Sequence, residues 1–189
     1  MIVLVGFMGA GKTTVGHLLA AELELPFADS DQLIEQRAGR PIRQIFAEDG
    51  EAAFRALEHQ VIAELLEGSD LILALGGGAA EHPRTRDTLA SHPRAQVVYL
   101  QVGYAQAQRR VGGDGGRPML ARPDLAAVYE RRLAAYAGVA TLTVATDDRH
   151  PEAVSADILS NLAADRAHVR APVPPGACSA QPLRSVPCG

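Results

Sequence analysis

The hydrophobic positions of this 189-residue chain alternate between short apolar runs and longer stretches with helical periodicity. Apolar runs of strand length occur at 2–5, 25–28, 71–75, 96–102 and 140–145. Between these runs, apolar residues recur every three or four positions, which predicts helices. The predicted helices cover the residues from the first glycine-rich turn to about Leu23, 32–37, 42–66 with a break near Gly50, 83–91, 104–111, 124–137 and 151–165.

Strands that alternate with helices are typical of an α/β fold in which helices cover both faces of a parallel sheet. In such sheets, ligands bind beyond the carboxyl ends of the strands. We therefore expect the functional residues in the segments that follow 2–5, 25–28 and 71–75.

The length suits a single domain, and a hydrophobic content of 47% is enough to build a core. From Arg170 onward, the composition shifts to Pro, Ala and Ser with little periodicity. We expect a folded domain at 1–168 and a disordered tail at 169–189. Both cysteines, Cys178 and Cys188, lie in this tail, so the predicted core needs no disulfide, as expected for a cytoplasmic protein.

The N-terminal apolar stretch, Met1 to Ala10, is too short to span a bilayer and lacks the basic region of a signal peptide. The net charge of −4 gives no general attraction to nucleic acid, and a chain without tryptophan offers no obvious base-stacking surface. We expect neither nucleic acid nor a membrane as a partner. The sequence does not report an oligomeric state, and our expectation is a monomer.

A glycine-rich segment directly follows the first predicted strand and opens the first helix. Residues 6–13, GFMGAGKT, fit G-x-x-x-x-G-K-[ST], the P-loop motif that cradles nucleotide phosphates. Lys12 can reach the β- and γ-phosphates, and the Thr13 hydroxyl can ligate Mg²⁺. A strand-to-helix turn without a ligand is the alternative, and the completeness of the motif disfavours it. The predicted nucleotide-binding residues here are Gly9, Ala10, Gly11, Lys12, Thr13 and Thr14.

A P-loop predicts nucleotide binding but not the reaction, because GTPases and motor ATPases share it. Asp29-Ser30-Asp31 follows the second predicted strand, and two carboxylates two residues apart on an extended segment point the same way. One could help to hold hydrated Mg²⁺, and the other could accept a proton from a substrate hydroxyl. The alternative is that Asp29 or Ser30 only caps a helix.

Two further segments add charge and bare backbone to the predicted site. Arg55 and Glu58 are three residues apart on a predicted helix and share a face, which on its own indicates an ordinary solvated pair. Gly76-Gly77-Gly78 ends the strand at 71–75, where bare backbone permits the close approach of a ligand. A flexible turn is the alternative for these glycines.

Residues 112–123 form a predicted lid. Residues 112–116 contain four glycines and are followed by Arg117-Pro118, so the segment can open and close. Closure would exclude water and bring Arg117 onto the transferring phosphoryl group, whose charge an arginine stabilises. The alternative is an exposed loop with a solvated arginine.

Taken together, these motifs resemble those of the shikimate kinases. GFMGAGKT, DSD, FRALE, GGGA and RPML occur in the family's order and approximate spacing, and the resemblance covers about residues 2–165. It implies a P-loop three-layer fold like that of nucleoside-monophosphate kinases, with a five-stranded parallel sheet flanked by helices. It also implies an enzyme of aromatic amino acid biosynthesis that uses ATP and Mg²⁺ to phosphorylate shikimate to shikimate 3-phosphate.

The resemblance implies a role for each residue of the acceptor pocket. Asp31 would contact the shikimate hydroxyls and act as the base. Arg55 would bind the shikimate carboxylate, and Glu58 would orient Arg55. Gly77 and Gly78 would line the same pocket.

A second carboxylate-binding arginine is implied on the helix after the lid, and Arg132 is its counterpart. The family shows Arg-x-Pro-x-Tyr there, whereas residues 132–136 read RLAAY without the proline, and the adjacent Arg131 competes for the role. Two guanidinium groups suit a planar carboxylate and select an acid over a neutral polyol.

The resemblance also places arginines around the adenine of the nucleotide. One arginine before the lid would stack on the ring, with Arg149 and Pro151 on the far side. Both Arg109 and Arg110 lie in the right segment, and Arg110 is preferred.

For the transfer itself, the resemblance implies that Lys12 and Arg117 neutralise phosphate charge and that Asp29 joins the Mg²⁺ shell, mostly through water. Two other functions are possible for such a chain: a kinase of another acceptor, such as gluconate or a nucleotide, and a nucleotide-binding module without catalysis. The paired arginines and the D-x-D motif disfavour the first. The presence of Lys12, Asp31 and Arg117 disfavours the second.

Overall fold

The computed structural model describes residues 1–111 and 124–169, with side chains described as far as residue 164. The predicted lid at 112–123, with Arg117, and the predicted tail from residue 170 onward lie outside the described residues. The boundaries of the domain, the lid and the tail therefore stay predictions.

The described chain contains a five-stranded parallel sheet. Its strands are β1 (Ile2–Val5), β2 (Phe27–Asp29), β3 (Ile72–Ala74), β4 (Gln96–Gln101) and β5 (Leu142–Ala145). Their order in the sheet is β2-β3-β1-β4-β5, and all neighbouring pairs are parallel. β1 lies at the centre, where Val3 pairs with Leu73 on one side and Val97 on the other. Every residue of β1 is buried, as expected for a strand that is covered on both faces.

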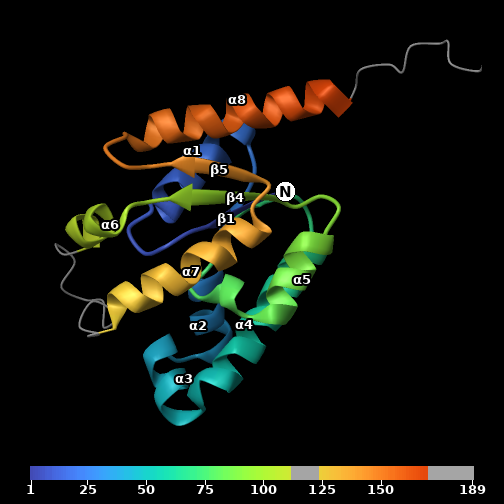
Figure 1. Cartoon of the computed structure of the whole chain (residues 1–189). Helices are drawn as coiled ribbons and strands as arrows, with labels where there is room; N and C mark the ends of the chain where they lie inside the picture. Colours follow the sequence, from blue (N-terminus) through green and yellow to red (C-terminus); the bar gives the residue numbers. More distant parts are fainter. Residues whose placement is uncertain (112–123, 170–189) are drawn as a thin grey trace, which may run out of the picture.

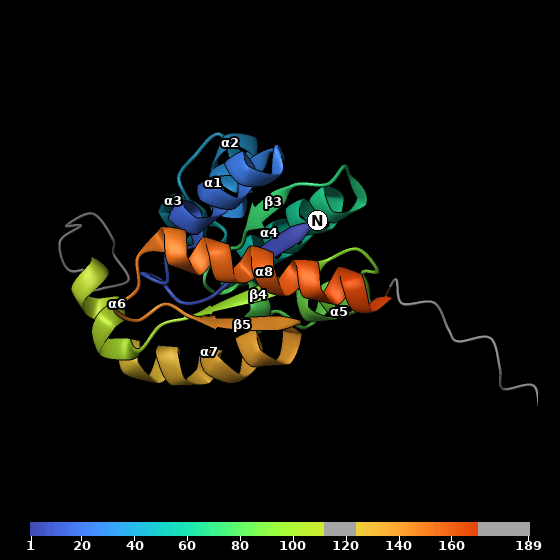
Figure 2. The same ribbon diagram turned by 90° about the horizontal axis from the view of Figure 1, so that it is seen from above.

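Helices cover both faces of the sheet (Figures 1 and 2), which confirms the predicted three-layer α/β class. α1 (Lys12–Leu23) and α8 (Pro151–Val169) pack against each other on one face. α7 (Leu125–Val139) lies on the other face with α4 (Gly50–Glu67) and α5 (Pro83–Ser91). The remaining elements are α2 (Ser30–Ala38), α3 (Ile42–Glu48), the 3-10 helix η1 (Ala79–Glu81) and α6 (Tyr104–Val111). Within the described residues, no helix is both long and apolar enough to cross a membrane.

Two hydrophobic cores fix the elements that carry the site. The main core surrounds β1, where Val3 and Leu4 have no exposed surface. A smaller core joins α2, α3 and α4, and it consists of Ile34, Ile45, Phe54 and Val61. Two of these residues belong to α4, so the part of that helix between them has a defined orientation.

The observed elements depart from the predicted ones mainly in the second strand. β2 ends at Asp29, one residue after the predicted end at 28. α2 begins at Ser30, two residues before the predicted start at 32. The prediction that Asp29 and Asp31 share an extended segment is therefore wrong, because Asp31 lies in the first turn of a helix. The predicted break near Gly50 is confirmed, since Gly50 has φ +83° where α3 ends and α4 begins.

Candidate active site

Three segments of the predicted site lie together at the carboxyl edge of the sheet. The P-loop follows β1, Asp29 ends β2, and the three glycines at 76–78 follow β3. These strands are neighbours in the order β2-β3-β1, so the segments that leave them lie side by side. The sheet thus assembles one site from positions far apart in the sequence.

The P-loop leaves the N-terminus of α1 without a side-chain cap. Gly11 precedes the helix with φ +91°, a left-handed conformation that favours glycine. Gly11 also has no side chain that could cap the first turn of α1. The N–H groups and the positive end of the helix dipole can therefore receive an anion. A Cβ on Gly9 would lie 2.8 Å from Val111 Cγ2, so a larger residue at this position would push the loop away from α6.

The remaining P-loop side chains lie around this turn. Lys12 Nζ donates to the carbonyl oxygens of Gly6 at 2.8 Å and of Phe7 at 3.3 Å, so its side chain folds back along the loop. Thr13 and Thr14 are exposed in the first turn of α1. The lysine and both threonines are thus within the segment that would meet the phosphates.

Thr13 and Asp29 meet beside the P-loop. The Thr13 hydroxyl donates to Asp29 Oδ2 at 3.4 Å, and Asp29 Oδ1 accepts from the N–H of Asp31 at 3.0 Å. Asp29 therefore caps α2, as the alternative interpretation predicts, and its second oxygen accepts from Thr13 of the P-loop. A hydroxyl and a carboxylate oxygen fit Mg²⁺, which binds oxygen ligands and keeps several waters. The described residues contain no group of three or more His, Cys, Asp or Glu that could hold a metal, so such an ion would also depend on phosphate oxygens and water.

Asp31 is partly buried between the P-loop and the glycines after β3. A Cβ on Gly76 would overlap Asp31 Oδ1. Burial raises the pKa of Asp31 and the negative charge of Asp29 adds to this effect, whereas Lys12 and Arg55 oppose it. A carboxylate with a raised pKa is a better proton acceptor for a hydroxyl than an ordinary aspartate.

Arg55 and Glu58 form a buried ion pair rather than the solvated pair that their spacing alone indicates. Arg55 Nη1 donates to Glu58 Oε2 at 2.6 Å, and the two side chains are 14% and 1% exposed. The guanidinium carbon of Arg55 lies 5.1 Å from the ring centre of Phe54. Glu58 Oε1 is buried and has no hydrogen-bond partner among the described residues. Burial raises the pKa of Glu58 to about 7 in spite of the positive charge of Arg55.

Each glycine after β3 lies against a charged side chain. The neighbours that an added Cβ would meet are Asp31 and Glu58 at Gly76, Arg132 at Gly77 and Arg55 at Gly78. The backbone of this segment is held in place, because the Gly76 N–H donates to Ser30 Oγ at 2.9 Å and the Tyr136 hydroxyl donates to Gly77 O at 2.5 Å. The glycines thus form a fixed strip of bare backbone rather than a flexible turn.

The structure separates the two candidate arginines of α7. The Arg132 side chain is 7% exposed and its Nη1 lies next to Gly77, whereas the Arg131 side chain is 63% exposed. Both arginines donate through Nε to Glu81, Arg132 to Oε2 at 2.6 Å and Arg131 to Oε1 at 2.7 Å. Arg132 is the one that lies at the glycines, which supports its predicted role.

The arginines considered for adenine also differ in position. Arg110 donates to Gly9 O and to Thr146 Oγ1, both at 3.2 Å, and so joins the P-loop to the segment after β5. Arg109 is exposed and bonds within its own helix. Arg149 bonds within its own segment at the start of α8. The adenine contacts stay predictions, and the position of Arg110 beside the P-loop supports the preference for it.

Sequence reasoning missed several polar side chains that hold the site together. They are Ser30, Glu81, Tyr136 and Thr146. Ser30 lies within Asp29-Ser30-Asp31 and Tyr136 within RLAAY at 132–136, so these two motifs are the sequence signal that could have identified them. Glu81 and Thr146 are single polar residues without a local pattern, and only the fold reveals their partners.

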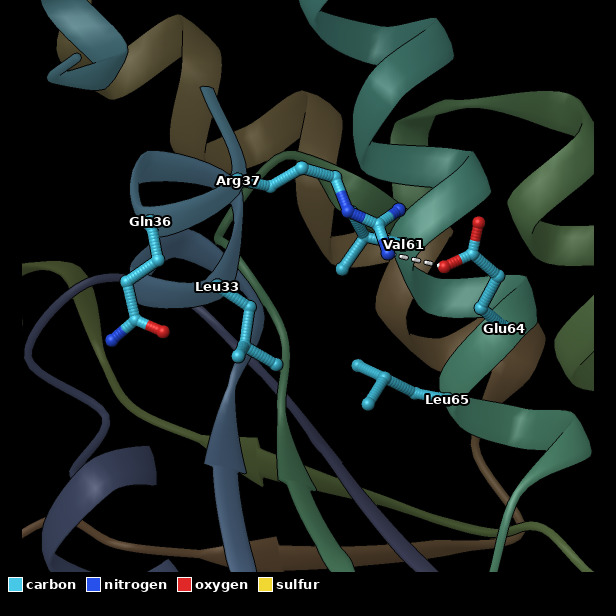
Figure 3. A pocket seen from close by; sticks show the side chains of 6 residues that line it. All are labelled: Leu33, Gln36, Arg37, Val61, Glu64 and Leu65. Carbon is cyan, nitrogen blue, oxygen red and sulfur yellow. Dashed lines mark hydrogen bonds and ion pairs between the residues drawn. The ribbon is translucent and has the colours of Figure 1, made fainter. Parts of the chain in front are cut away.

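A separate groove of about 400 Å³ lies between α2 and α4 (Figure 3). Its lining residues are Leu33, Gln36, Arg37, Val61, Glu64 and Leu65. The single cation among them, Arg37, is paired with Glu64 at 2.5 Å across the groove. No predicted site residue lines this groove, and we assign it no part in the active site.

Comparison with known proteins decides the family. A sequence model of the shikimate kinase family matches residues 8–163. The chain is 47% identical to a shikimate kinase of Thermobifida fusca over 167 residues, and these residues cover 87% of this chain and 95% of that protein. The chain belongs to the shikimate kinase family.

Further relatives agree with this assignment. A shikimate kinase of Mycobacterium avium is 46% identical over 166 residues, which cover 86% of this chain and 93% of that protein. Among solved structures, a shikimate kinase from Acinetobacter baumannii in complex with shikimate matches with a TM-score of 0.81 and 36% identity, over 87% of this chain and 93% of that chain. The family, the P-loop kinase fold and the class of enzyme, a kinase that transfers phosphate to a hydroxyl, are confirmed as predicted.

Replacement of Glu58 by Gln should change how stability depends on pH. The folded-state pKa of about 7 lies above the ordinary value of 4.5, so the folded protein binds this proton more tightly than the unfolded chain does. The contribution of Glu58 to the free energy of unfolding is therefore greatest below pH 4.5, falls as pH rises to about 7, and is constant above that. The total fall should be up to about 3 kcal/mol.

Chemical denaturation of wild type and Glu58→Gln from about pH 4.5 to 8 measures this effect. The free energy of unfolding of the wild type minus that of Glu58→Gln should decrease with rising pH. Glu64→Gln, an exposed glutamate on the same helix, is the matched control and should show no such decrease. A pH-independent difference for Glu58→Gln would contradict the raised pKa.

Proposed function

We propose that the chain transfers the γ-phosphoryl group of ATP to a hydroxyl of shikimate, giving shikimate 3-phosphate and ADP. Membership of the shikimate kinase family supports this activity. The roles of individual residues are proposed from the geometry. The observation that supports them best is the convergence of Asp31, Arg55 and Arg132 on the glycine strip beside the P-loop.

The acceptor pocket is proposed at the glycine strip, residues 76–78. Arg55 from α4 and Arg132 from α7 both lie against it, so they approach from different helices. Two guanidinium groups can bind a planar carboxylate through paired hydrogen bonds, which would favour an acid over a neutral polyol. The buried partner Glu58 fixes Arg55 before the substrate arrives, which reduces the ordering required on binding.

The nucleotide is proposed to lie along residues 9–14, with its β- and γ-phosphates at the N-terminus of α1. Lys12 would exchange its carbonyl partners for phosphate oxygens. Arg110 would stack on adenine from its position beside the P-loop, with Arg149 and Pro151 on the far side.

Mg²⁺ is proposed to bind the Thr13 hydroxyl directly and Asp29 mostly through water. The hydrogen bond between these side chains supports the assignment, because it places two oxygen ligands side by side at the P-loop. When bound, the ion would neutralise charge on the β- and γ-phosphates.

In the proposed reaction, the shikimate hydroxyl oxygen bonds to the γ-phosphorus while the bond to the β–γ bridging oxygen breaks and ADP leaves. The hydroxyl proton passes to the Asp31 carboxylate, whose raised pKa suits this role. Lys12 and, from the lid, Arg117 would stabilise the charge on the phosphoryl oxygens. The part of Arg117 is proposed from its motif alone, since it lies outside the described residues.

We also propose that the protein is a cytoplasmic monomer. The cysteines lie only at 178 and 188, so a reducing compartment would leave the core unaffected. Among the described residues, Phe46 is the only large hydrophobic side chain that is exposed, at 36%, which supports the monomer.

Release of ADP, measured with a coupled assay and several acceptors, tests the proposed function. Turnover should be fastest with shikimate, slower with quinate and at background with gluconate. Equal rates with all three acids would show that the acceptor pocket does not select shikimate. The absence of turnover with all three would contradict the activity itself.

Replacement of Asp31 by Asn should reduce kcat by about 10²- to 10⁴-fold, because the amide cannot accept the hydroxyl proton. The affinity for ATP should stay close to that of the wild type. Glu35→Gln is the matched control and should keep kcat close to that of the wild type, since Glu35 is an acid one turn further along the same helix whose side chain accepts from the N–H of Ile42 and adds only its charge to the surroundings of Asp31. Wild-type turnover in the Asp31→Asn protein would remove Asp31 from the mechanism.

A further inference from the structure

An acidic residue outside the sequence motifs links the glycine strip to α7. Glu81 is the last residue of η1, shortly after Gly78, and its side chain is 21% exposed. Its Oε2 accepts from Arg132 Nε and its Oε1 accepts from Arg131 Nε, at 2.6 Å and 2.7 Å. Each carboxylate oxygen therefore has an arginine partner, and the segment that carries the glycines is tied to the helix that carries Arg132.

The bond to Glu81 fixes the direction in which the Arg132 guanidinium points. A guanidinium carries five N–H donors in one plane, on Nε and on the two Nη atoms. Glu81 engages Nε, whereas Nη1 lies 3.3 Å from the position of a Cβ on Gly77. Glu81 therefore holds the guanidinium through Nε, and Nη1 is directed at the glycine strip, where the acceptor carboxylate is proposed to bind.

The ion pair with Glu81 stabilises Arg132 more than it stabilises Arg131. The Arg131 side chain is 63% exposed, so water screens its ion pair, which contributes little. The Arg132 side chain is 7% exposed, and a cation buried to this extent is unfavourable without a counter-charge. Burial raises the pKa of Glu81, but hydrogen bonds from both arginines outweigh this effect and leave the pKa below its ordinary value. Glu81 is thus a charged partner whose main effect is on Arg132.

We propose that Glu81 is a positioning residue for the shikimate carboxylate, because it holds the Arg132 guanidinium with Nη1 toward the glycine strip. The proposal rests on the proposed function, in which Arg132 binds that carboxylate. The opposite possibility is that Glu81 competes with the substrate for Arg132. The geometry disfavours competition, since Glu81 engages Nε while Nη1 faces the strip.

Steady-state kinetics of Glu81→Gln, with shikimate and ATP varied separately, test the proposal. Glutamine keeps the size of the side chain and one acceptor oxygen but removes the negative charge. The KM for shikimate should rise about 5- to 20-fold, as expected when a charge-assisted hydrogen bond becomes a neutral one. The kcat and the KM for ATP should change by less than about threefold, because Glu81 contacts no group proposed to act on the nucleotide. A merely structural role would lower kcat and stability without this selective rise.

Three further variants test whether Glu81 affects shikimate binding through Arg132. Arg131→Gln removes the exposed partner and should leave the KM for shikimate within about twofold of wild type. Glu64→Gln breaks a glutamate–arginine pair outside the site and should leave it unchanged. In an Arg132→Ala background, Glu81→Gln should produce a smaller rise than it does in the wild type, because the two substitutions remove the same interaction.

An unchanged KM for shikimate in Glu81→Gln would overturn the proposal, and a lowered KM would overturn it by showing that Glu81 competes with the substrate. If Glu81→Gln does not fold, Glu81→Asp provides the test, since its shorter carboxylate keeps the charge but reaches Arg132 less well. A higher KM in Glu81→Asp supports the proposal, and an unchanged KM overturns it.

The wild-type assay separates this proposal from the proposed function. If the wild type releases no ADP with shikimate, the proposed function fails, and calorimetric titration of shikimate into wild type and Glu81→Gln then tests Glu81 alone. Weaker binding to the variant supports the positioning role. Equal binding, or no binding to the wild type, overturns it.

Discussion

The absence of side chains from the three glycines that follow β3 is the constraint on which the rest of the site depends. At the first and last glycines of the strip, Gly76–Gly78, a Cβ would overlap a charged group, Asp31 in one case and Arg55 in the other. The carboxylate of Asp31 from α2 and the guanidinium of Arg55 from α4 can therefore approach the same short segment of backbone. This close grouping removes charged groups from water, which raises the pKa of Asp31 and of Glu58. The arginines offset the buried negative charge and are directed at the position proposed for an anionic substrate.

The sequence predicts the parts of this structure that depend on neighbouring residues. Hydrophobic periodicity locates the five strands and the break at Gly50, and the P-loop motif locates the phosphate cradle, because each is encoded within a short segment. The conformation of Asp31 is predicted wrongly. The Asp29 carboxylate accepts from the N–H of Asp31 at 3.0 Å and so starts α2 at Ser30, whereas the apolar pattern places the start of the helix two residues later.

Contacts between distant segments could not be predicted in this way. Arg131 and Arg132 are adjacent, and on a helix they point about 100° apart, so the packing of α7 decides which one faces the glycines. Resemblance to the family names Arg132 but gives it no partner. Glu81 meets Arg132 across 51 residues of sequence, and no local pattern marks it as part of the site. The residues that orient the predicted side chains are thus the ones that require the structure.

Binding of shikimate to Gly78→Ala, measured by isothermal titration calorimetry, tests the role of the bare backbone most directly. Gly78 has φ −104°, which alanine adopts without strain, so the substitution adds only a methyl group. This methyl group would displace the Arg55 guanidinium from its place against the glycine. We predict that the affinity for shikimate falls by at least about 30-fold while the affinity for ATP stays near that of the wild type. An unchanged affinity for shikimate in a folded Gly78→Ala protein would contradict a pocket built on the approach of Arg55 to bare backbone.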